Sequence, residues 1–265
     1  MEKIEINSQK ITEYFNTGKR FDGRKPEEFR ELIIEAGVSE NAEGSARVKL
    51  GDTDVIVGVK LATSTPYPDS PNKGNFMVSA ELSPMSSPRF EAGPPKFPVI
   101  EFGRVLDRGL RESGFINWEK LCIKEKEKVW TVFVDIYTIN DAGNLMDAAG
   151  IGAIAAMKTA KLPKYDEETD MIDYKNITDM PLPLNNVTPI AITAYKIGNK
   201  ILIDPTREEQ DAATARITVG SSEGIISSIQ KGEEDSMTPE EIGEALDLID
   251  IAYKNIFKSL EKQLK

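Results

Sequence analysis

Residues 44–62 read GSARVKLGDTDVIVGVKLA, and this stretch decides the fold class. Apolar side chains recur at every second position on either side of Gly51-Asp52, at Ala46, Val48, Leu50, Val55, Val57, Val59 and Leu61. A period of two places such side chains on one face of a strand, and a Gly-Asp pair between two runs is a turn signal. The stretch therefore predicts a β-hairpin with one buried face.

Working outward, the same order of elements recurs later in the chain. Further strands are expected at 76–82, 119–124 and 129–139, with helices at 99–113 and 145–161. The second half offers strands at 190–197, 200–204, 214–219 and 224–230, with a hairpin turn at Gly198-Asn199. A final helix from Pro239 to Leu264 follows, with Thr238 as its cap. Two units of hairpin, strand and helix predict an α+β fold with two similar halves.

These elements divide the chain into four parts. Residues 1–30 are predicted to hold a helix capped by Ser8 and ended by Gly18, followed by a charged turn. Residues 31–163 form the first half, and the acidic and then proline-rich residues 164–187 form a connection. Residues 188–265 form the second half with its final helix.

Composition limits the chemistry that the protein can perform. The 265 residues include no histidine and one cysteine, Cys122, which excludes a Ser-His-Asp triad, a histidine-ligated zinc site and an internal disulfide. No stretch approaches the about 20 apolar residues of a membrane helix, and no signal peptide is evident, so a cytoplasmic protein without a membrane partner is expected. The net charge of −11 opposes a freestanding nucleic-acid binder, so any contact with nucleic acid must be local.

The expected helix at 99–113 carries an arginine stripe. At 100° per residue, Arg104, Arg108 and Arg111 fall within about 60° of one another, opposite the apolar side of the helix. Two interpretations stay open. The stripe is a solvated face, since Glu101, Asp107 and Glu112 stand at pairing distance. Alternatively the stripe binds phosphate, because the guanidinium group can form two parallel hydrogen bonds to phosphate oxygens. All three basic residues of the stripe are arginine although lysine is more common in the chain, and this favours the second interpretation.

Two other motifs have plainer interpretations. Residues 150–155, GIGAIA, fit the dinucleotide pattern GxGxxA, but they lie inside the expected Ala-rich helix instead of at a strand-to-helix turn. Small residues there indicate close packing of helix on sheet. Residues 204–211, DPTREEQD, could offer oxygen ligands to magnesium, although such a run is more typical of a solvated loop, which we favour.

Taken in order, these pieces resemble the RNase PH family, whose members remove nucleotides from RNA 3′ ends with phosphate. The resemblance covers about residues 20–256. It rests on RFDGR at 20–24, the hairpin at 44–55, the helix at 100–111, and Asp141 leading into the small-residue helix. The loop at 66–74, PYPDSPNKG, resembles the non-catalytic branch found in exosome rings, with the archaeal subunit as the nearest likeness. The resemblance implies an RNase PH-like fold, of the ribosomal protein S5 domain 2-like kind.

The resemblance also implies that the chain lacks catalytic residues. In the family an arginine in a Gly-Gly-Thr-Arg setting holds phosphate at a helix start, whereas residues 141–145 here read DAGNL, with Leu145 in the arginine position. The family's acidic pair corresponds to Glu209 and Ala215, so one carboxylate is missing. No catalytic residue, metal or cofactor is therefore expected, and Arg104, Arg108 and Arg111 are the expected RNA-binding residues.

The expected partners follow from the same resemblance. They are a catalytic RNase PH-like subunit in an alternating hetero-hexamer with three of each, cap proteins with S1 or KH modules, and single-stranded RNA. Two alternatives stay open. One is an active phosphate-dependent 3′-to-5′ exoribonuclease that places Glu208, Glu209 or Asp211 on a metal, and the other is a protein of the same fold that does not use RNA.

Overall fold

A computed structural model describes residues 2–17 and 19–264, and the side chains of residues 2–8 lie outside the description. The elements of the first half are α1 (Glu2–Asn16), β1 (Leu32–Ala36), β2 (Gly44–Leu50), β3 (Thr53–Ser64), β4 (Asn75–Glu81), α2 (Phe97–Arg111), the 3₁₀ turn η1 (Glu119–Leu121), β5 (Cys122–Lys124), β6 (Lys128–Asn140) and α3 (Leu145–Thr159). Those that follow are β7 (Lys161–Asp166), β8 (Met171–Pro181), β9 (Ile190–Ile197), β10 (Lys200–Ile203), α4 (Arg207–Ala212), β11 (Ala215–Ser222), β12 (Ile225–Gly232) and α5 (Pro239–Gln263).

The strands form two main sheets. The first has the order β1-β2-β3-β6-β4, with β5 paired to β6, and the second has the order β10-β9-β11-β12. The hairpin predicted from residues 44–62 is confirmed, since Leu50 pairs with Thr53 and Ala46 with Val57. Its alternating apolar side chains are fully buried, as the period of two requires.

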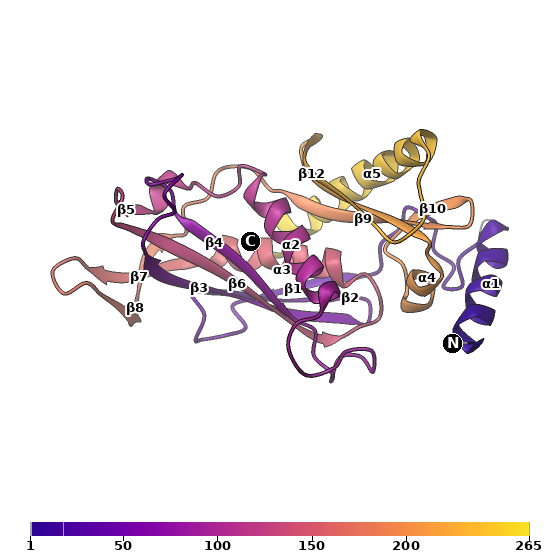
Figure 1. Cartoon of the computed structure of the whole chain (residues 1–265), viewed down its shortest axis with the longest axis horizontal. Helices are drawn as coiled ribbons and strands as arrows, with labels where there is room; N and C mark the ends of the chain where they lie inside the picture. Colours follow the sequence, from indigo (N-terminus) through magenta and orange to yellow (C-terminus); the bar gives the residue numbers. More distant parts are fainter. Residues whose placement is uncertain (1, 18, 265) are drawn as a thin grey trace.

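Helix α3 lies between the two sheets and is buried from Leu145 to Met157 (Figure 1). Its glycines explain how it fits there. A side chain at Gly152 would come within 2.7 Å of the Val57 Cγ2 atom, and one at Gly150 would meet Leu106 at 3.4 Å. The GxGxxA pattern therefore serves close packing, which confirms the packing interpretation over the dinucleotide one.

The structure differs from the sequence prediction in several elements. The connection at 164–187 carries structure of its own, because β7 and β8 pair there as an antiparallel hairpin. Strand β1 was not predicted, and Ser8 lies inside α1 instead of capping it, while Gly18 lies outside the described residues. At the other end of the chain, Thr238 caps α5 as predicted, in a capping box with Glu241.

Candidate functional site

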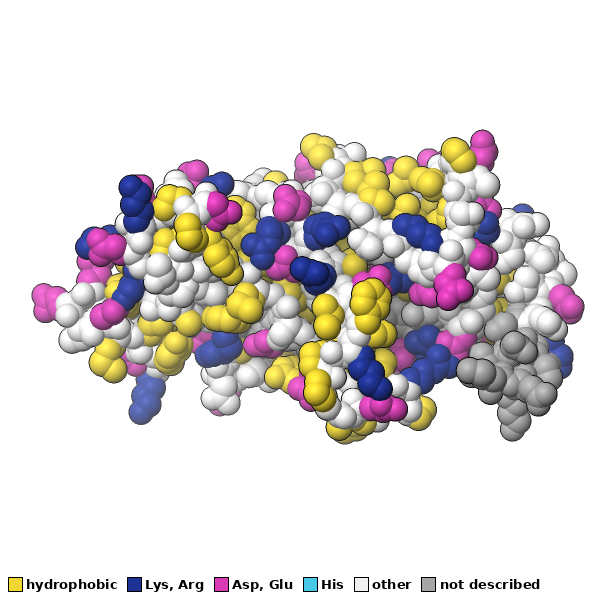
Figure 2. All heavy atoms as spheres, viewed as in Figure 1, with side chains coloured by type: hydrophobic (Ala, Val, Ile, Leu, Met, Phe, Trp, Pro, Cys, Tyr) yellow, Lys and Arg dark blue, Asp and Glu magenta, His cyan; other side chains and the backbone are white. Residues whose placement is uncertain are grey.

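Helix α2 has a buried face and a charged face. Its apolar side packs inward through Phe102, Val105, Leu106 and Leu110, which recur at helical spacing. Arg104 and Arg108 are exposed on the other side, and Arg111 is half-buried beside them. Figure 2 shows Lys and Arg side chains gathered in the middle of the visible face, where α2 lies in Figure 1. The structure therefore brings the three predicted arginines together on one surface.

The three arginines differ in what they contact. Arg111 forms a two-pronged ion pair with Asp107, at 2.8 and 2.9 Å, and donates to the backbone carbonyl of Phe76 at 2.9 Å. The hydrogen bonds from Arg111 to Asp107 raise the pKa of that guanidinium. Its guanidinium carbon also lies 5.5 Å from the centre of the Phe76 ring. Arg111 is thus held by the fold, as a solvated-face interpretation expects.

Arg104 and Arg108 are much freer. Arg108 donates one long hydrogen bond of 3.4 Å to Gln230 on β12, and Arg104 forms no ion pair or hydrogen bond within the described part of the chain. Glu101, a possible partner from the same helix, pairs instead with Arg216 at 3.0 Å. Two guanidinium groups on α2 are therefore available to an external anion.

A groove of about 570 Å³ runs along this face between α2, β4 and the loop after β3. Arg104, Arg108, Tyr67 and Met77 line it, and the Tyr67 and Met77 side chains are each 52% exposed. Guanidinium groups can bind phosphate, and an exposed aromatic ring can stack on a nucleobase, so this groove has the chemistry of a single-stranded RNA contact. Sequence reasoning missed Tyr67, whose one signal is an aromatic residue within a proline-rich loop.

The start of α3, where the family resemblance places phosphate, is filled by the protein's own groups. Leu145 is buried at the first position of the helix. The backbone N–H of Gly143 donates to the Asp141 carboxylate at 3.1 Å, and that of Asn144 donates to the Gln210 side chain at 2.8 Å. The loop before α3 thus uses these two backbone donors within the chain, and the first helical position holds a buried apolar side chain.

Cations do lie near this loop, but carboxylates pair with them. Arg207 contacts Asp141 at 3.1 Å and Asp211 at 2.6 Å, and Arg89 also binds Asp211. A side chain at Gly143, whose φ is +92°, would overlap the backbone of Thr206 at 2.6 Å, so the loop and the start of α4 are in direct contact. The arginines around the loop therefore offer little uncompensated positive charge.

The acidic run at 204–211 is not a solvated loop, so that prediction was wrong. Residues 207–212 form α4, capped by Thr206 in a capping box with Glu209. Glu209 is buried and receives a two-pronged pair from Arg20 at 2.9 and 2.6 Å. Glu208 is the one member of the proposed acidic set that is exposed, while Glu209 and Asp211 are bound by arginines. Ala215 is buried on β11 and adds no carboxylate.

Asp204 joins three parts of the chain. Its fully buried carboxylate accepts from Arg24 at 2.9 Å, from Arg30 at 2.7 Å and from the Asn144 amide at 3.0 Å. Arg30 also donates to the carbonyls of Ala142 and Gly143, at 2.9 and 3.1 Å. Among the described residues no three Asp, Glu, His or Cys side chains are grouped so that they could hold a metal ion.

One further acid lies beneath this loop. Asp147, in the first turn of α3, is fully buried and accepts from Asn144 Nδ2 at 3.0 Å and from Thr193 Oγ1 at 2.8 Å. Burial raises the pKa of Asp147 to about 7, against the lowering effect of these hydrogen bonds.

Comparison with known proteins identifies the family to which this fold belongs. Residues 28–163 match domain 1 of the 3′ exoribonuclease family, RNase PH, and residues 188–248 match domain 2. The chain belongs to the RNase PH family, which confirms the predicted family and its α+β fold.

Within that family, similar curated relatives include archaeal proteins. The exosome complex component Rrp42 of Methanocella arvoryzae is 46% identical over 245 residues, which are 92% of this chain and 91% of that protein. The protein of the same name from Thermococcus kodakarensis is 45% identical over 96% of this chain and 93% of its own length. A solved structure of the Archaeoglobus fulgidus exosome with RNA bound to the active site has a chain with a TM-score of 0.89 and 41% identity, covering 97% of this chain and 99% of that one. In the described part of this chain, no helix is both long and apolar enough to cross a membrane.

Proposed function

We propose that this protein is a non-catalytic subunit of an archaeal exosome ring, where it supports the active site of a catalytic RNase PH-like neighbour and contacts RNA. Similar relatives are named exosome complex components, and similar structures include an archaeal exosome with RNA bound to the active site and an archaeal exosome core, which supports membership of such a complex. The proposed ring alternates three copies of this chain with three of the catalytic subunit, carries cap proteins with S1 or KH modules, and works in the cytoplasm.

The proposed inactivity rests on the residues at the start of α3. Leu145 is buried where phosphate would need a cation, and Gly143 and Asn144 donate their N–H groups to side chains of this chain. A charged hydrogen bond contributes about 1.5–3 kcal/mol, and loss of electrostatic support for a transition state costs roughly 10² to 10³ in rate. The active-enzyme alternative needs Glu208, Glu209 or Asp211 on a metal, and two of these three already bind arginine.

Phosphorolysis assays test this proposal. The purified chain should release no nucleoside diphosphate from single-stranded RNA and phosphate, whereas the chain mixed with its catalytic partner should do so. Native mass spectrometry of the mixture should show three copies of each subunit. Phosphate-dependent release of nucleoside diphosphate by the chain alone would refute the proposed inactivity.

The RNA contact predicts a specific loss of affinity. In the reconstituted ring, the double variant Arg104→Ala/Arg108→Ala should bind single-stranded RNA about tenfold more weakly, because two exposed guanidinium groups are lost. The slope of log affinity against log salt should become shallower by about 1.4, since each lost contact with single-stranded nucleic acid contributes about 0.7. Filter binding at several salt concentrations measures both quantities. Arg111 is left intact, because its contacts with Asp107 and Phe76 make it part of the fold.

The control for this variant removes the same charge elsewhere. Lys254→Ala/Lys258→Ala takes two exposed cations from α5 and should leave the salt slope unchanged. Equal weakening in both variants would show that net charge, and not the α2 face, governs binding.

A further inference from the structure

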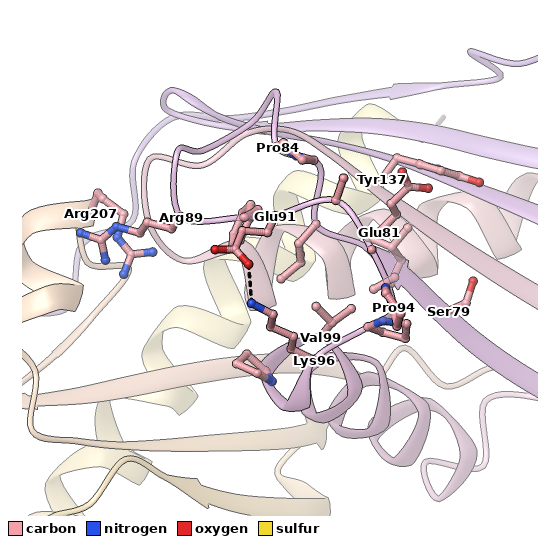
Figure 3. Close-up of a pocket in the computed structure, with 18 residues that line it drawn as sticks. Ser79, Glu81, Pro84, Arg89, Glu91, Pro94, Lys96, Val99, Tyr137 and Arg207 are labelled. Carbon is pink, nitrogen blue, oxygen red and sulfur yellow. Dashed lines mark hydrogen bonds and ion pairs between the residues drawn. The ribbon is translucent and has the colours of Figure 1, made fainter.

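Arg89 and Arg207 form an unusual pair at one end of a cavity. Both line a cavity of about 750 Å³ between the loop at 82–96, β4, β6 and the start of α2. Figure 3 shows their guanidinium groups side by side, with Glu81 at the opposite end of the cavity. Two neighbouring guanidinium groups repel each other, and an anion that contacts both of them offsets this repulsion. The anion that this chain supplies is the carboxylate of Asp211.

Asp211 accepts hydrogen bonds from both arginines. Arg89 Nη1 donates to Asp211 Oδ1 at 2.6 Å, and Arg89 Nη2 donates to Oδ2. Arg207 donates to the same Oδ1 through Nη2 at 2.6 Å and through Nε at 3.1 Å. A single carboxylate thus receives four donors from two guanidinium forks, an arrangement that also suits a tetrahedral oxyanion.

We propose that Arg89 and Arg207 form a latent oxyanion site, and that the Asp211 carboxylate acts as an internal anion that keeps it closed. The ligand class is inorganic phosphate or a phosphate monoester. The site does not depend on the α2 groove or on the proposed RNA contact, because neither Arg89 nor Arg207 lines that groove.

The surroundings of the pair fit this role. The Arg89 side chain is 44% exposed, so solvent and small anions reach it, whereas Asp211 is 17% exposed. The other charged pair of the cavity, Lys96 with Glu91, is self-neutralised (Figure 3). Asp141 forms an ion pair with Arg207 at 3.1 Å and partly neutralises it. Without the Asp211 carboxylate, the site therefore depends mainly on Arg89. Arg89 and Asp211 also join the loop of the first half to α4 of the second, which offers a purely structural explanation to be tested against ours.

Removal of the internal anion distinguishes the two explanations. In the full chain, Asp211→Ser should bind inorganic phosphate about tenfold more tightly than the unmodified protein, because both forks lose their carboxylate. Isothermal titration calorimetry with sodium phosphate, at ionic strength held constant with chloride, measures the change. Uridine monophosphate serves as a second probe, and the tighter of the two ligands shows whether the site prefers free phosphate or a phosphate on a nucleoside.

Two matched variants complete the test. Glu208→Ser removes the same charge from an exposed position of the same helix and should leave phosphate affinity unchanged. Arg89→Gln/Asp211→Ser should lose the gained affinity. Asp211→Asn keeps the shape of the side chain, and it should show the same gain if the serine variant does not fold. If a folded Asp211 variant binds phosphate no better than Glu208→Ser, the latent site is refuted and Asp211 is only a structural tie.

Discussion

Replacement of Asp204 by asparagine is expected to lower the free energy of unfolding by about 3–5 kcal/mol, because it removes the buried carboxylate that Arg24 and Arg30 share. Arg24 then keeps its pair with Asp22 at 2.7 Å, so most of the loss falls on Arg30. The Asp204 carboxylate is fully buried, and the side chains of its partners Arg24 and Arg30 are only 13% and 12% exposed. Asparagine can accept a hydrogen bond but carries no charge to offset two cations. A domain is stabilised by only about 5–15 kcal/mol, so this loss is a large part of the total.

The measurement is the midpoint and slope of unfolding in urea. Asp54→Asn is the matched control, since Asp54 also forms a two-pronged pair, with Arg47 at 2.7 and 3.0 Å, but the Arg47 side chain is 34% exposed. Because solvent screens that pair, its loss should cost about 1 kcal/mol or less. Similar losses in the two variants would contradict the central role of Asp204.

The position of Asp204 also explains what sequence reasoning could and could not predict. Period-two alternation predicts the hairpin at 44–62, and helical spacing predicts the arginine face of α2, because both patterns are local. Asp204 meets Arg24 and Arg30 across 180 and 174 residues, and no local pattern carries such pairings. The acidic run at 204–211 therefore read as a solvated loop, although most of its carboxylates have arginine partners.

The missed strands have a different physical cause. β8 is exposed over nearly its whole length and, among the described strands, pairs only with β7, so no buried face imposes an alternating pattern on its sequence. Pro163 and Pro181, which lie within these two strands, also count against strand when the sequence is read alone. In β1 just one side chain, Ile34, is buried. Part of the candidate site could be predicted, because the arginine face of α2 follows from helical spacing. Tyr67 and Arg89 could not be predicted, because they lie in loops whose paths have no local sequence pattern.

The second large effect concerns the pH dependence of stability. Asp147→Asn should make the folded protein more stable than the unmodified one at pH 8, by up to about 4 kcal/mol, which is the equivalent of a pKa raised from 3.8 to about 7. Because the pKa is higher in the folded state, the folded protein binds more protons than the unfolded one between these values. The contribution of Asp147 to stability is therefore largest below about pH 4, falls as pH rises toward 7, and is constant above that. Asparagine cannot ionise, so it avoids this fall.

Asparagine also suits the hydrogen bonds around position 147. Its amide oxygen can accept from Asn144 Nδ2 and Thr193 N, the two donors to Asp147 Oδ2, and its amide nitrogen can donate to Thr193 Oγ1. Urea unfolding of both proteins from pH 4.5 to 8 gives the difference in stability at each pH, in which the titration of all other groups cancels. Asp247→Asn, which changes an exposed carboxylate of α5, should follow the unmodified protein throughout.

The opposite pH dependence would show that Asp147 is charged in the folded protein. Suppose that the unmodified protein becomes more stable than Asp147→Asn as pH rises. Asp147 is then ionised in the folded protein, and two effects together outweigh the cost of its burial: its hydrogen bonds and the positive end of the α3 dipole. In that case the first turn of α3 would already hold a negative charge beside Leu145, and an incoming phosphate would be repelled as well as left without a cation. If instead Asp147 is protonated near pH 7, the proposed inactivity rests on the apolar side chain of Leu145 and on the internally bonded N–H groups of Gly143 and Asn144 alone.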